Sequence, residues 1–323
     1  MQIKSILKVI EEAASIALLT HQNPDIDGLS SMLAFALAFP KKDFIPLIES
    51  IPYQARFLHG FESLIPSEKI ENPVKPDLVI VFDASCEKRI DERVREKILP
   101  PKRVLVFDHH QGEVCDNLFK AKTSWIVNSK EASTSVLLYR FFKRAKINIT
   151  DRMAENLLAG IYYDTGGFRH ENVKGDIFKI AHELVTLGAR PSYIAQALFD
   201  NIPLSQVEFL KLVLERMEFL REGSIALSYL TWEDFRRLGG EKALNDLAGF
   251  LRQIEGVTLS ALVKEVEKDL IKVSLRSKAP FEAISIAKKY SGGGHRYACG
   301  FQIQGVSLQE FLRKFKEQLE KSL

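Results

Sequence analysis

Apolar runs of strand length alternate with segments of helical periodicity through the first part of the chain. The predicted strands are 16–20, 44–48, 78–82 and 103–107. The predicted helices are 3–14, 28–39 and 88–98, with a proline-rich stretch of loops and short helical pieces at 51–76. A strand–helix alternation of this kind favours a parallel sheet.

The period changes after residue 131, and it changes again after residue 223. The helices predicted between these points are 132–144, 151–163, 174–187, 192–200 and 204–219. The C-terminal part is predicted to hold strands 224–230, 257–266, 270–276 and 298–303 with helices 280–289 and 307–320. We therefore predict an α/β fold with a parallel-sheet domain at 1–187, a helical connector at 188–220 and a smaller α/β domain at 221–323.

Length and charge narrow the classes of function. A chain of 323 residues exceeds one typical core and suggests about two domains. Its net charge of +3 argues against a long nucleic-acid partner, which calls for a strongly basic surface, but leaves a small anionic ligand open. No apolar run approaches the roughly 18 residues of a membrane span, so we expect a cytoplasmic protein with no membrane partner.

Acidic and imidazole side chains follow the predicted strands at the point where each strand ends. The residues in question are His21, Asp25 and Asp27 after the first strand, Asp83 after the third, Asp108, His109 and His110 at the fourth, and Asp164 at the end of helix 151–163. The carboxyl ends of parallel strands meet at the edge of the sheet where ligands bind. Carboxylates gathered there would repel one another and raise their pKa values unless cations lay between them.

Oxygen ligands with one or two imidazoles suit Mn²⁺ and, less tightly, Mg²⁺. Two such ions about 3.5–4 Å apart can activate a water molecule and neutralise charge on a phosphoryl group. Each acid also has a simpler explanation: Asp25 would cap the helix near Gly28, Asp83 would turn the chain, and Asp164 lies in a glycine-containing turn. Taken together, the four clusters favour the metal site.

Five motifs in this order resemble the DHH phosphoesterase superfamily with its DHH-associated C-terminal domain, and the resemblance covers essentially the full length. They are His21-x-Asn23-Pro24-Asp25-x-Asp27, Phe82-Asp83-Ala84-Ser85, Asp108-His109-His110, Asp164-Thr165-Gly166-Gly167 and Ser291-Gly292-Gly293-Gly294-His295-Arg296. The two-domain layout is similar to the nanoRNase and phosphoadenosine-phosphate phosphatase group. Two departures are Ser30-Ser31, where the family usually has Gly-Ser, and Ser291 in place of a first glycine.

The resemblance implies a role for each of these residues. His21 and Asp25 would hold one Mn²⁺, and Asp27, His109 and Asp164 would hold the other, while Asp83 would bridge the two. Asp108 would orient a neighbouring ligand, and His110 would face the scissile phosphate. Asp83, Asp108 and His110 are accordingly the candidate catalytic residues.

The glycine run before His295 is the candidate substrate-binding device. Gly293 and Gly294 can adopt positive φ and bring backbone N–H groups close to an anion, although a glycine run alone is more often a flexible turn. Arg276, Arg296 and Arg252 offer guanidinium groups suited to phosphate. We expect Arg276 and His295 to hold the 5′-phosphate or nucleobase end of a short substrate. In the first domain Ser133 and Thr134 would contact phosphate, unless they only cap helix 132–144, and Arg169 is a further candidate.

We therefore predict a phosphodiesterase that uses two Mn²⁺ ions to hydrolyse short oligoribonucleotides and linear dinucleotides such as pApA to 5′-mononucleotides, with the 3′-phosphate of phosphoadenosine phosphate as a further target. The alternatives are a cyclic di-AMP phosphodiesterase, a RecJ-type exonuclease, a manganese pyrophosphatase and a nucleotide-binding sensor without catalysis. The resemblance suggests a homodimer. An apolar stripe on the connector is either the interface of this dimer or part of the core of a single chain. The stripe consists of Val207, Leu210, Val213, Leu214 and Met217.

Overall fold

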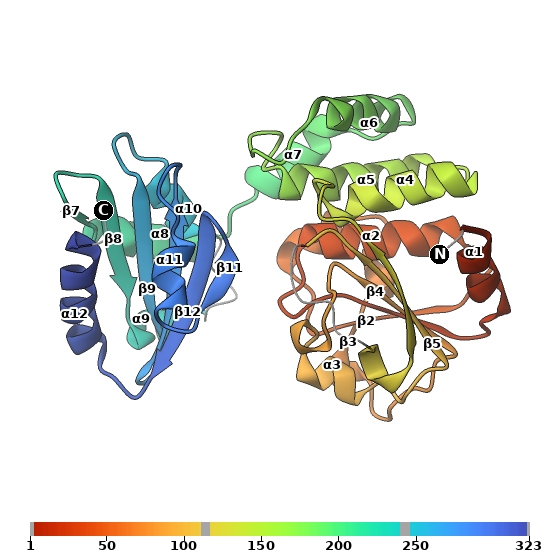
Figure 1. The fold of residues 1–323 in the computed structure, drawn as a ribbon, viewed down its shortest axis with the longest axis horizontal. Coiled ribbons are helices and arrows are strands. Elements are labelled where there is room, and N and C mark those ends of the chain that lie inside the picture. The colour runs from red at the N-terminus through yellow and green to blue at the C-terminus, as the bar shows by residue number, and fades with distance from the viewer. Residues whose placement is uncertain (1–2, 111–116, 240–245, 322–323) are drawn as a thin grey trace. The chain divides into compact units, whose positions relative to one another are not determined.

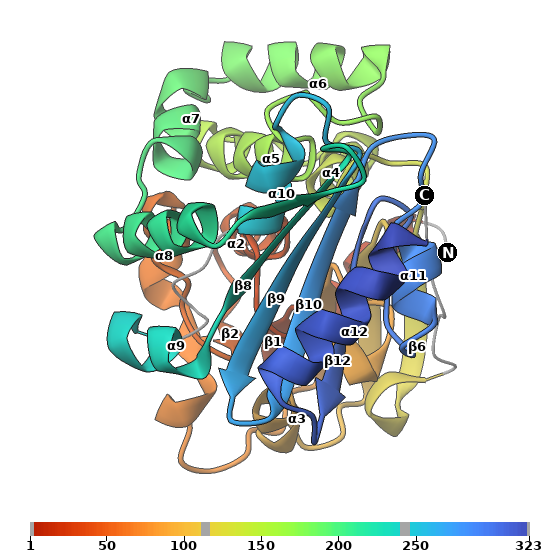
Figure 2. The same ribbon diagram turned by 90° about the vertical axis from the view of Figure 1, so that its left-hand side faces the viewer.

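The computed structural model describes residues 3–110, 117–239 and 246–321. The chain divides into two compact units, Met1–Asn201 and Ile202–Leu323, whose elements are labelled between Figure 1 and Figure 2. The predicted connector 188–220 is shared between them, because its first helix belongs to the first unit and its second helix to the second. The three-part division of the chain stays a prediction. No helix within the described ranges is long and apolar enough to span a membrane.

The first unit is built on a six-stranded sheet in which every pair of neighbours is parallel, in the order β3-β2-β1-β4-β5-β6. Its strands are β1 (Ile16–Leu19), β2 (Phe44–Ile48), β3 (Ile65–Pro66), β4 (Leu78–Phe82), β5 (Arg103–Asp108) and β6 (Lys122–Val127). The chain order reverses between β1 and β4, and open α/β sheets bind ligands beyond the carboxyl ends of their strands at such a switch point. The predicted parallel sheet is confirmed.

Helices cover both faces of this sheet (Figure 1). The α-helices are α1 (Ile3–Glu12), α2 (Ile26–Ala38), α3 (Glu92–Glu96), α4 (Thr134–Ala145), α5 (Asp151–Asp164), α6 (Gly175–Thr186) and α7 (Pro191–Phe199). Short 3-10 helices lie at Tyr53–Phe57, Phe61–Ser63, Ser67–Lys69, Glu87–Arg89 and Leu118–Lys120. Ile80 and Phe82 pack towards α1, α2, α4 and α5, whereas Val79 and Val81 pack towards α3. Strands buried on both faces explain the continuous apolar runs of the sequence.

The second unit holds a mixed sheet in the order β11-β12-β10-β9-β8-β7, and only β8 and β9 are parallel neighbours among the described strands. Its strands are β7 (Glu218–Leu220), β8 (Ile225–Leu230), β9 (Leu259–Glu267), β10 (Leu270–Ser277), β11 (Gly293–His295) and β12 (Ala298–Gln304). Its helices are α8 (Leu204–Glu215), α9 (Trp232–Leu238), α10 (Leu247–Arg252), α11 (Ile284–Lys288) and α12 (Leu308–Glu320). One core packs α11 and α12 against the sheet, and a second packs α8, α9 and α10 (Figure 2).

Several elements differ from the sequence prediction. Strand β6 was missed because it begins Lys-Thr-Ser and lies at the edge of the sheet, where one side of the strand faces solvent. The helix predicted at 88–98 is a 3-10 turn followed by the short α3. The helix predicted at 204–219 ends at Glu215, and strand β7 follows it. The glycine run, expected to form an anion-accepting concavity, contributes the short strand β11.

Candidate metal centre

The first metal-ligand candidates lie at the switch point of the parallel sheet. His21 follows β1 by two residues, and Asp83 follows β4 directly. Asp108 is the last residue of β5, next in the sheet to β4, and His109 and His110 come directly after it. Parallel pairing of β1, β4 and β5 therefore brings residues from three distant segments to one edge.

Asp25 uses its two carboxylate oxygens for different purposes. Its Oδ1 accepts the backbone N–H of Gly28 at 3.0 Å and thereby caps α2. Its Oδ2 lies 3.4 Å from Nε2 of His21. The helix cap and the proposed metal ligation are therefore compatible. The cap uses one oxygen of Asp25 and fixes the carboxylate so that the other oxygen faces His21.

Asp27 is fully buried in the first turn of α2 and meets the N-terminus of α4. Its Oδ2 accepts the N–H of Thr134 at 2.6 Å, and its Oδ1 accepts the N–H of Ser135 at 3.0 Å. The first N–H groups of a helix have no partner within the helix and favour negative charge. These two bonds hold the carboxyl group of Asp27 against the first turn of α4.

Asp83 lies between the other candidates. Its backbone has φ of +62°, and its N–H donates to the carbonyl of Phe107 at 2.8 Å. Its Oδ2 is 3.4 Å from Nε2 of His21, and its Oδ1 is 3.5 Å from Nε2 of His109. The hydroxyl of Thr134 donates to Oδ1 at 2.7 Å. The two oxygens of Asp83 therefore face different imidazoles, as a bridging carboxylate would.

Backbone carbonyls set the tautomers of the two imidazoles. Nδ1 of His21 lies 2.7 Å from the carbonyl of Gln22, and Nδ1 of His109 lies 3.3 Å from the carbonyl of Glu131. A carbonyl only accepts hydrogen bonds, so each Nδ1 carries the proton and each Nε2 is left with a lone pair when the imidazole is neutral. Both Nε2 atoms are buried and make no hydrogen bond within the described part of the chain. Imidazoles held in this way fit a metal ion.

Among the described residues, the candidate ligands form three groups that could each hold an ion. The groups are His21–Asp25–Asp83, Asp27–His109–Asp164 and Asp83–His109–His110, and within each the ligand atoms lie within 4.8 Å of one another. Asp164, the last residue of α5, contributes an oxygen 3.0 Å from Nε2 of His109. The first two groups match the two ligand sets that the resemblance implies, and Asp83 links them through His109.

The charges in this cluster perturb one another strongly. Burial raises the pKa of Asp27 well above its usual value, and the nearby carboxylates of Asp164 and Asp83 raise it further. Burial and neighbouring carboxylates raise the pKa of Asp164 to about 6 against the opposing effect of His109. Burial lowers the pKa of His109, but Asp164 and the other acids outweigh it and raise the pKa to about 10. Divalent cations would relieve the repulsion among these acids.

Asp108 and His110 form a pair beside these groups. The fully buried Asp108 accepts the backbone N–H of His110 at 3.0 Å, and its Oδ1 lies 2.8 Å from Nδ1 of the same residue. Asp108 therefore orients His110 and turns its Nε2 away. That Nε2 lies 3.4 Å from Nη2 of Arg89, a residue that the sequence analysis did not single out.

The remaining candidates of the first unit have protein partners. Ser133 caps α4 by accepting the N–H of Val136 at 3.1 Å, so the cap alternative describes it. Thr134 gives its N–H and its hydroxyl to carboxylates of the cluster, as described above. Nε of Arg169 donates to the carbonyl of Gly166 at 2.6 Å, in the turn that follows Asp164.

In the second unit, Arg276 and His295 lie in one row of the sheet. Ala298 of β12 pairs with Arg276 of β10 on one side and with His295 of β11 on the other, so the two residues face the same side of the sheet. Nε of Arg276 is 2.8 Å from Oδ2 of Asp246, which also caps α10. Strand β12 lies between the two residues.

The other candidates of the second unit surround this row. Arg252 points Nη1 towards the carbonyl of Ser277, 3.4 Å away, and Arg296 pairs with Glu282. Gly294 has φ of +128°, whereas Gly293 does not adopt positive φ. The predicted run of left-handed glycines is therefore a strand with a single such position.

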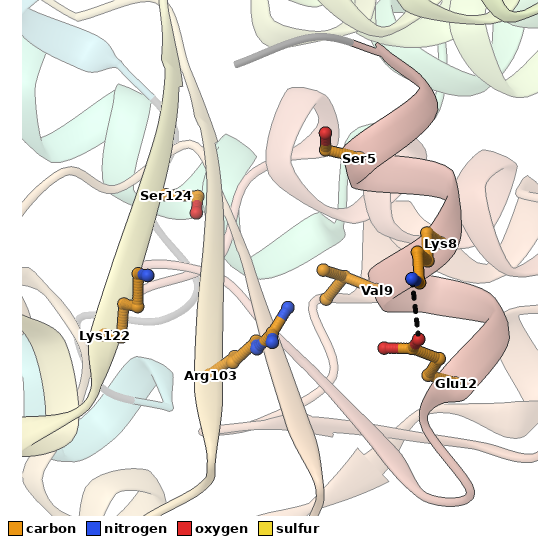
Figure 3. A pocket seen from close by; sticks show the side chains of 7 residues that line it. All are labelled: Ser5, Lys8, Val9, Glu12, Arg103, Lys122 and Ser124. Atoms are coloured by element: carbon orange, nitrogen blue, oxygen red, sulfur yellow. Dashed lines mark ion pairs between the residues drawn. The ribbon is translucent and has the colours of Figure 1, made fainter.

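A separate cavity of about 290 Å³ lies between α1 and the starts of β5 and β6 (Figure 3). Arg103 and Lys122, the first residues of these strands, are register neighbours, which places the cavity at the amino ends of the strands. Lys8 pairs with Glu12 across its wall at 3.6 Å. The lining holds a single carboxylate and no imidazole among the described residues, so it lacks the donor set of the cluster at the opposite edge.

Two known domains match the chain. The N-terminal domain of the DHH family matches residues 15–161, from the start of the sheet to α5, and the DHHA1 domain matches residues 230–321. The chain belongs to the DHH family. The first match covers every candidate metal ligand except Asp164, which lies three residues beyond it, and the second covers the glycine-rich strand.

Relatives of this DHH-family protein align over nearly its whole length. The bifunctional oligoribonuclease and PAP phosphatase NrnA of Thermus thermophilus is 26% identical over 323 residues, covering 99% of this chain and 93% of the relative. NrnA of Bacillus subtilis is 26% identical and covers 92% of each chain. The crystal structure of an exopolyphosphatase-related protein from Bacteroides fragilis superposes with a TM-score of 0.84 at 25% identity, over 99% of this chain and 95% of that one. The protein is a DHH phosphoesterase related to NrnA at low identity.

Proposed function

We propose that this DHH-family protein uses two Mn²⁺ ions, or Mg²⁺ in their place, to hydrolyse short oligoribonucleotides and linear dinucleotides such as pApA to 5′-mononucleotides. The 3′-phosphate of phosphoadenosine phosphate is a second proposed substrate. The observation that carries the proposal is the position of Asp83, whose Oδ2 faces His21 of one ligand group while its Oδ1 faces His109 of the other. A shared carboxylate of this kind is what a two-ion phosphoesterase needs.

The ligand groups around Asp83 support the roles that the resemblance implies. His21, Asp25 and Asp83 would hold one ion, and Asp27, His109, Asp164 and Asp83 would hold the other. Bound ions of this type supply an activated water and neutralise the charge of the phosphoryl oxygens. His110, oriented by Asp108, would contact the scissile phosphate.

The C-terminal unit would hold the end of the substrate. Arg276 and His295 face the same side of the sheet with β12 between their strands, and a guanidinium and an imidazole on one face suit a 5′-phosphate. Arg252, Gly293, Gly294 and Arg296 surround that row in sequence or in space and would add to the same subsite. A grip on one terminal nucleotide explains a preference for short chains.

The proposed partners are a short nucleotide substrate and a second copy of the chain. The apolar stripe on α8 is divided in the structure: Val213 is fully buried, whereas Val207 and Leu214 are exposed. The exposed pair is the part of the stripe available to a dimer interface. We propose that the protein is a cytoplasmic homodimer. Light scattering of the wild type and of Val207→Glu measures the mass in solution and tests the dimer. A mass equal to one chain for both proteins would refute it.

The decisive experiment measures products. Purified protein with Mn²⁺ is given 5′-phosphorylated RNA of two to ten nucleotides, phosphoadenosine phosphate and cyclic di-AMP, and the products are separated by chromatography. We expect mononucleotides from the shortest RNAs and no turnover by Asp83→Ala, with Glu310→Ala, at an exposed position on α12, as an acidic control that stays active. Faster hydrolysis of cyclic di-AMP, or none of any substrate by the wild type, would reject the proposal.

A further inference from the structure

Arg89 lies beside the cluster and is held there from two sides. It ends the 3-10 helix Glu87–Arg89, and its backbone N–H donates to the carbonyl of Cys86 at 3.0 Å. Its carbonyl accepts the N–H of Gln22 at 2.6 Å, in the segment that carries His21. Ile90, the next residue, is buried in the core. The backbone of Arg89 therefore joins the segment after β4, which begins with Asp83, to the segment after β1, which carries His21.

The guanidinium of Arg89 points to the cluster and not to a carboxylate. Its Nη2 lies 3.4 Å from Nε2 of His110, and no ion pair joins Arg89 to an acid in the described part of the chain. Arg93, four residues along, pairs with both Asp91 and Glu49. A guanidinium carries five donors and stays charged at any physiological pH. Within the described ranges, Arg89 therefore keeps several donors for an anion beside His110.

We propose that Arg89 is a catalytic residue that binds the phosphoryl oxygens of the substrate next to His110 and stabilises the charge that develops on them during hydrolysis. The proposal rests on the proposed phosphoester hydrolysis but not on any preference for nucleotides. A planar guanidinium matches two oxygens of one phosphate, which a lysine cannot do. Donors placed for developing charge typically contribute about 10²–10³-fold to kcat.

The experiment compares Arg89→Gln and Arg89→Lys with Lys88→Gln. Lys88 is the exposed neighbour on the same turn, so its substitution removes the same charge without reaching the cluster. Each protein is assayed with Mn²⁺ on bis(p-nitrophenyl) phosphate and on pApA. Manganese content is measured by elemental analysis, and binding of inorganic phosphate to the manganese-loaded protein by calorimetry.

For Arg89→Gln we expect kcat to fall about 100-fold on both substrates, with the wild-type content of manganese. The Kd for inorganic phosphate should rise about tenfold. Arg89→Lys should recover only part of the loss, and Lys88→Gln should match the wild type. Unchanged kcat and phosphate affinity in Arg89→Gln would overturn the proposal, and so would a loss of manganese in step with activity, because Arg89 would then only support the ligands.

The two proposals fail in different ways. If the wild type hydrolyses bis(p-nitrophenyl) phosphate but not pApA, the nucleotide function is wrong, and the first substrate still decides the role of Arg89. If the wild type hydrolyses neither, the phosphate affinities of the wild type and Arg89→Gln decide it. Equal affinities in that case would overturn the proposal.

Discussion

The hydroxyl of Thr134 donates a 2.7 Å hydrogen bond to Oδ1 of Asp83, and the backbone N–H of the same residue donates a 2.6 Å bond to Oδ2 of Asp27. One residue in the first turn of α4 thus holds two carboxylates that belong to different ligand groups. Hydrogen bonds to the ligands of a metal commonly set its affinity. Thr134 is therefore a support of the cluster, whatever the substrate.

Replacing Thr134 by valine keeps the shape and the backbone bond but removes the hydroxyl. We expect the affinity for Mn²⁺ to fall by about 10–100-fold, the usual cost of losing such a partner. Thr134→Ser retains the hydroxyl and should stay within about twofold of the wild type. Calorimetric titration of the metal-free proteins measures both, and equal affinities for the valine and serine variants would contradict the prediction.

Gly160 lies in the middle of α5, where the chain passes under Asp27. A Cβ at this position would lie 2.1 Å from Oγ of Ser135, 2.4 Å from Oγ of Ser30 and 2.5 Å from Oδ1 of Asp27. Ser30 and Ser31 each lie within hydrogen-bond distance of Ser135, so the hydroxyls fill the space under the carboxylate. The helix can approach Asp27 closely only because residue 160 has no side chain.

Gly160→Ala should therefore lower the free energy of unfolding by about 1–3 kcal/mol, because overpacking outweighs the better helix propensity of alanine. Gly175→Ala is the matched control. Gly175 begins α6 and has open space around it, so alanine there should raise the free energy of unfolding by up to about 1 kcal/mol, the difference in helix propensity between glycine and alanine. Urea denaturation of both variants measures the difference. If Gly160→Ala were as stable as the control, the side chains around residue 160 would have to shift to make room for the methyl group, and the prediction would be wrong.

The parallel sheet and the gathering of acids and imidazoles at its carboxyl edge follow from the sequence, but two residues next to the cluster, Arg89 and Gly160, do not. Acids at strand ends are visible because apolar strands end abruptly at them, and parallel strands share one carboxyl edge. Arg89 lies in the charged stretch 87–95, where nothing in the spacing of the sequence distinguishes it from Arg93. Gly160 is likewise one glycine within a helical pattern. Both are set by contacts between segments far apart in the chain.

The glycine run shows the same limit in the second unit. Its composition predicts positive φ, but only Gly294 has it among the three glycines. At Gly292 a Cβ would lie 2.4 Å from the carbonyl oxygen of Gly300, so this glycine serves the close approach of two backbone segments. The glycine composition indicates that this segment has no room for side chains. The reason, the close approach of the segment to β12, is visible only in the pairing of β11 with β12.

Arg276→Ala should separate substrate gripping from chemistry. We expect KM for pApA to rise at least about tenfold, because a charged hydrogen bond to phosphate is lost, while KM for bis(p-nitrophenyl) phosphate changes less than about twofold. Arg313→Ala, at an exposed position on α12, is the control. Steady-state kinetics on both substrates decide the matter, and equal effects on the two would refute a subsite at Arg276.

Protons and metal ions compete for the imidazoles of this centre. The pKa values of these imidazoles therefore determine how metal affinity changes with pH. Burial lowers the pKa of His21, but Asp25 and Asp83 outweigh it and raise the pKa well above its usual value, while that of His109 is raised to about 10. In the metal-free protein, protonation of these two imidazoles stabilises the folded state. The stabilisation is complete at a pH below the pKa of histidine in the unfolded chain, about 6.5, and for His109 it is lost as the pH rises through about 10. A metal ion binds only the neutral imidazole.

Binding of Mn²⁺ at pH 7 should therefore release about one proton per imidazole, and its apparent affinity should increase from pH 6 towards pH 9. Asp164, whose pKa is raised to about 6, steepens this dependence at the acidic end, because it too must lose a proton. Calorimetry in two buffers of different ionisation enthalpy counts the protons. Binding of Mn²⁺ to His109→Asn should release fewer protons than binding to the wild type. An equal number of released protons would show that the metal binds elsewhere.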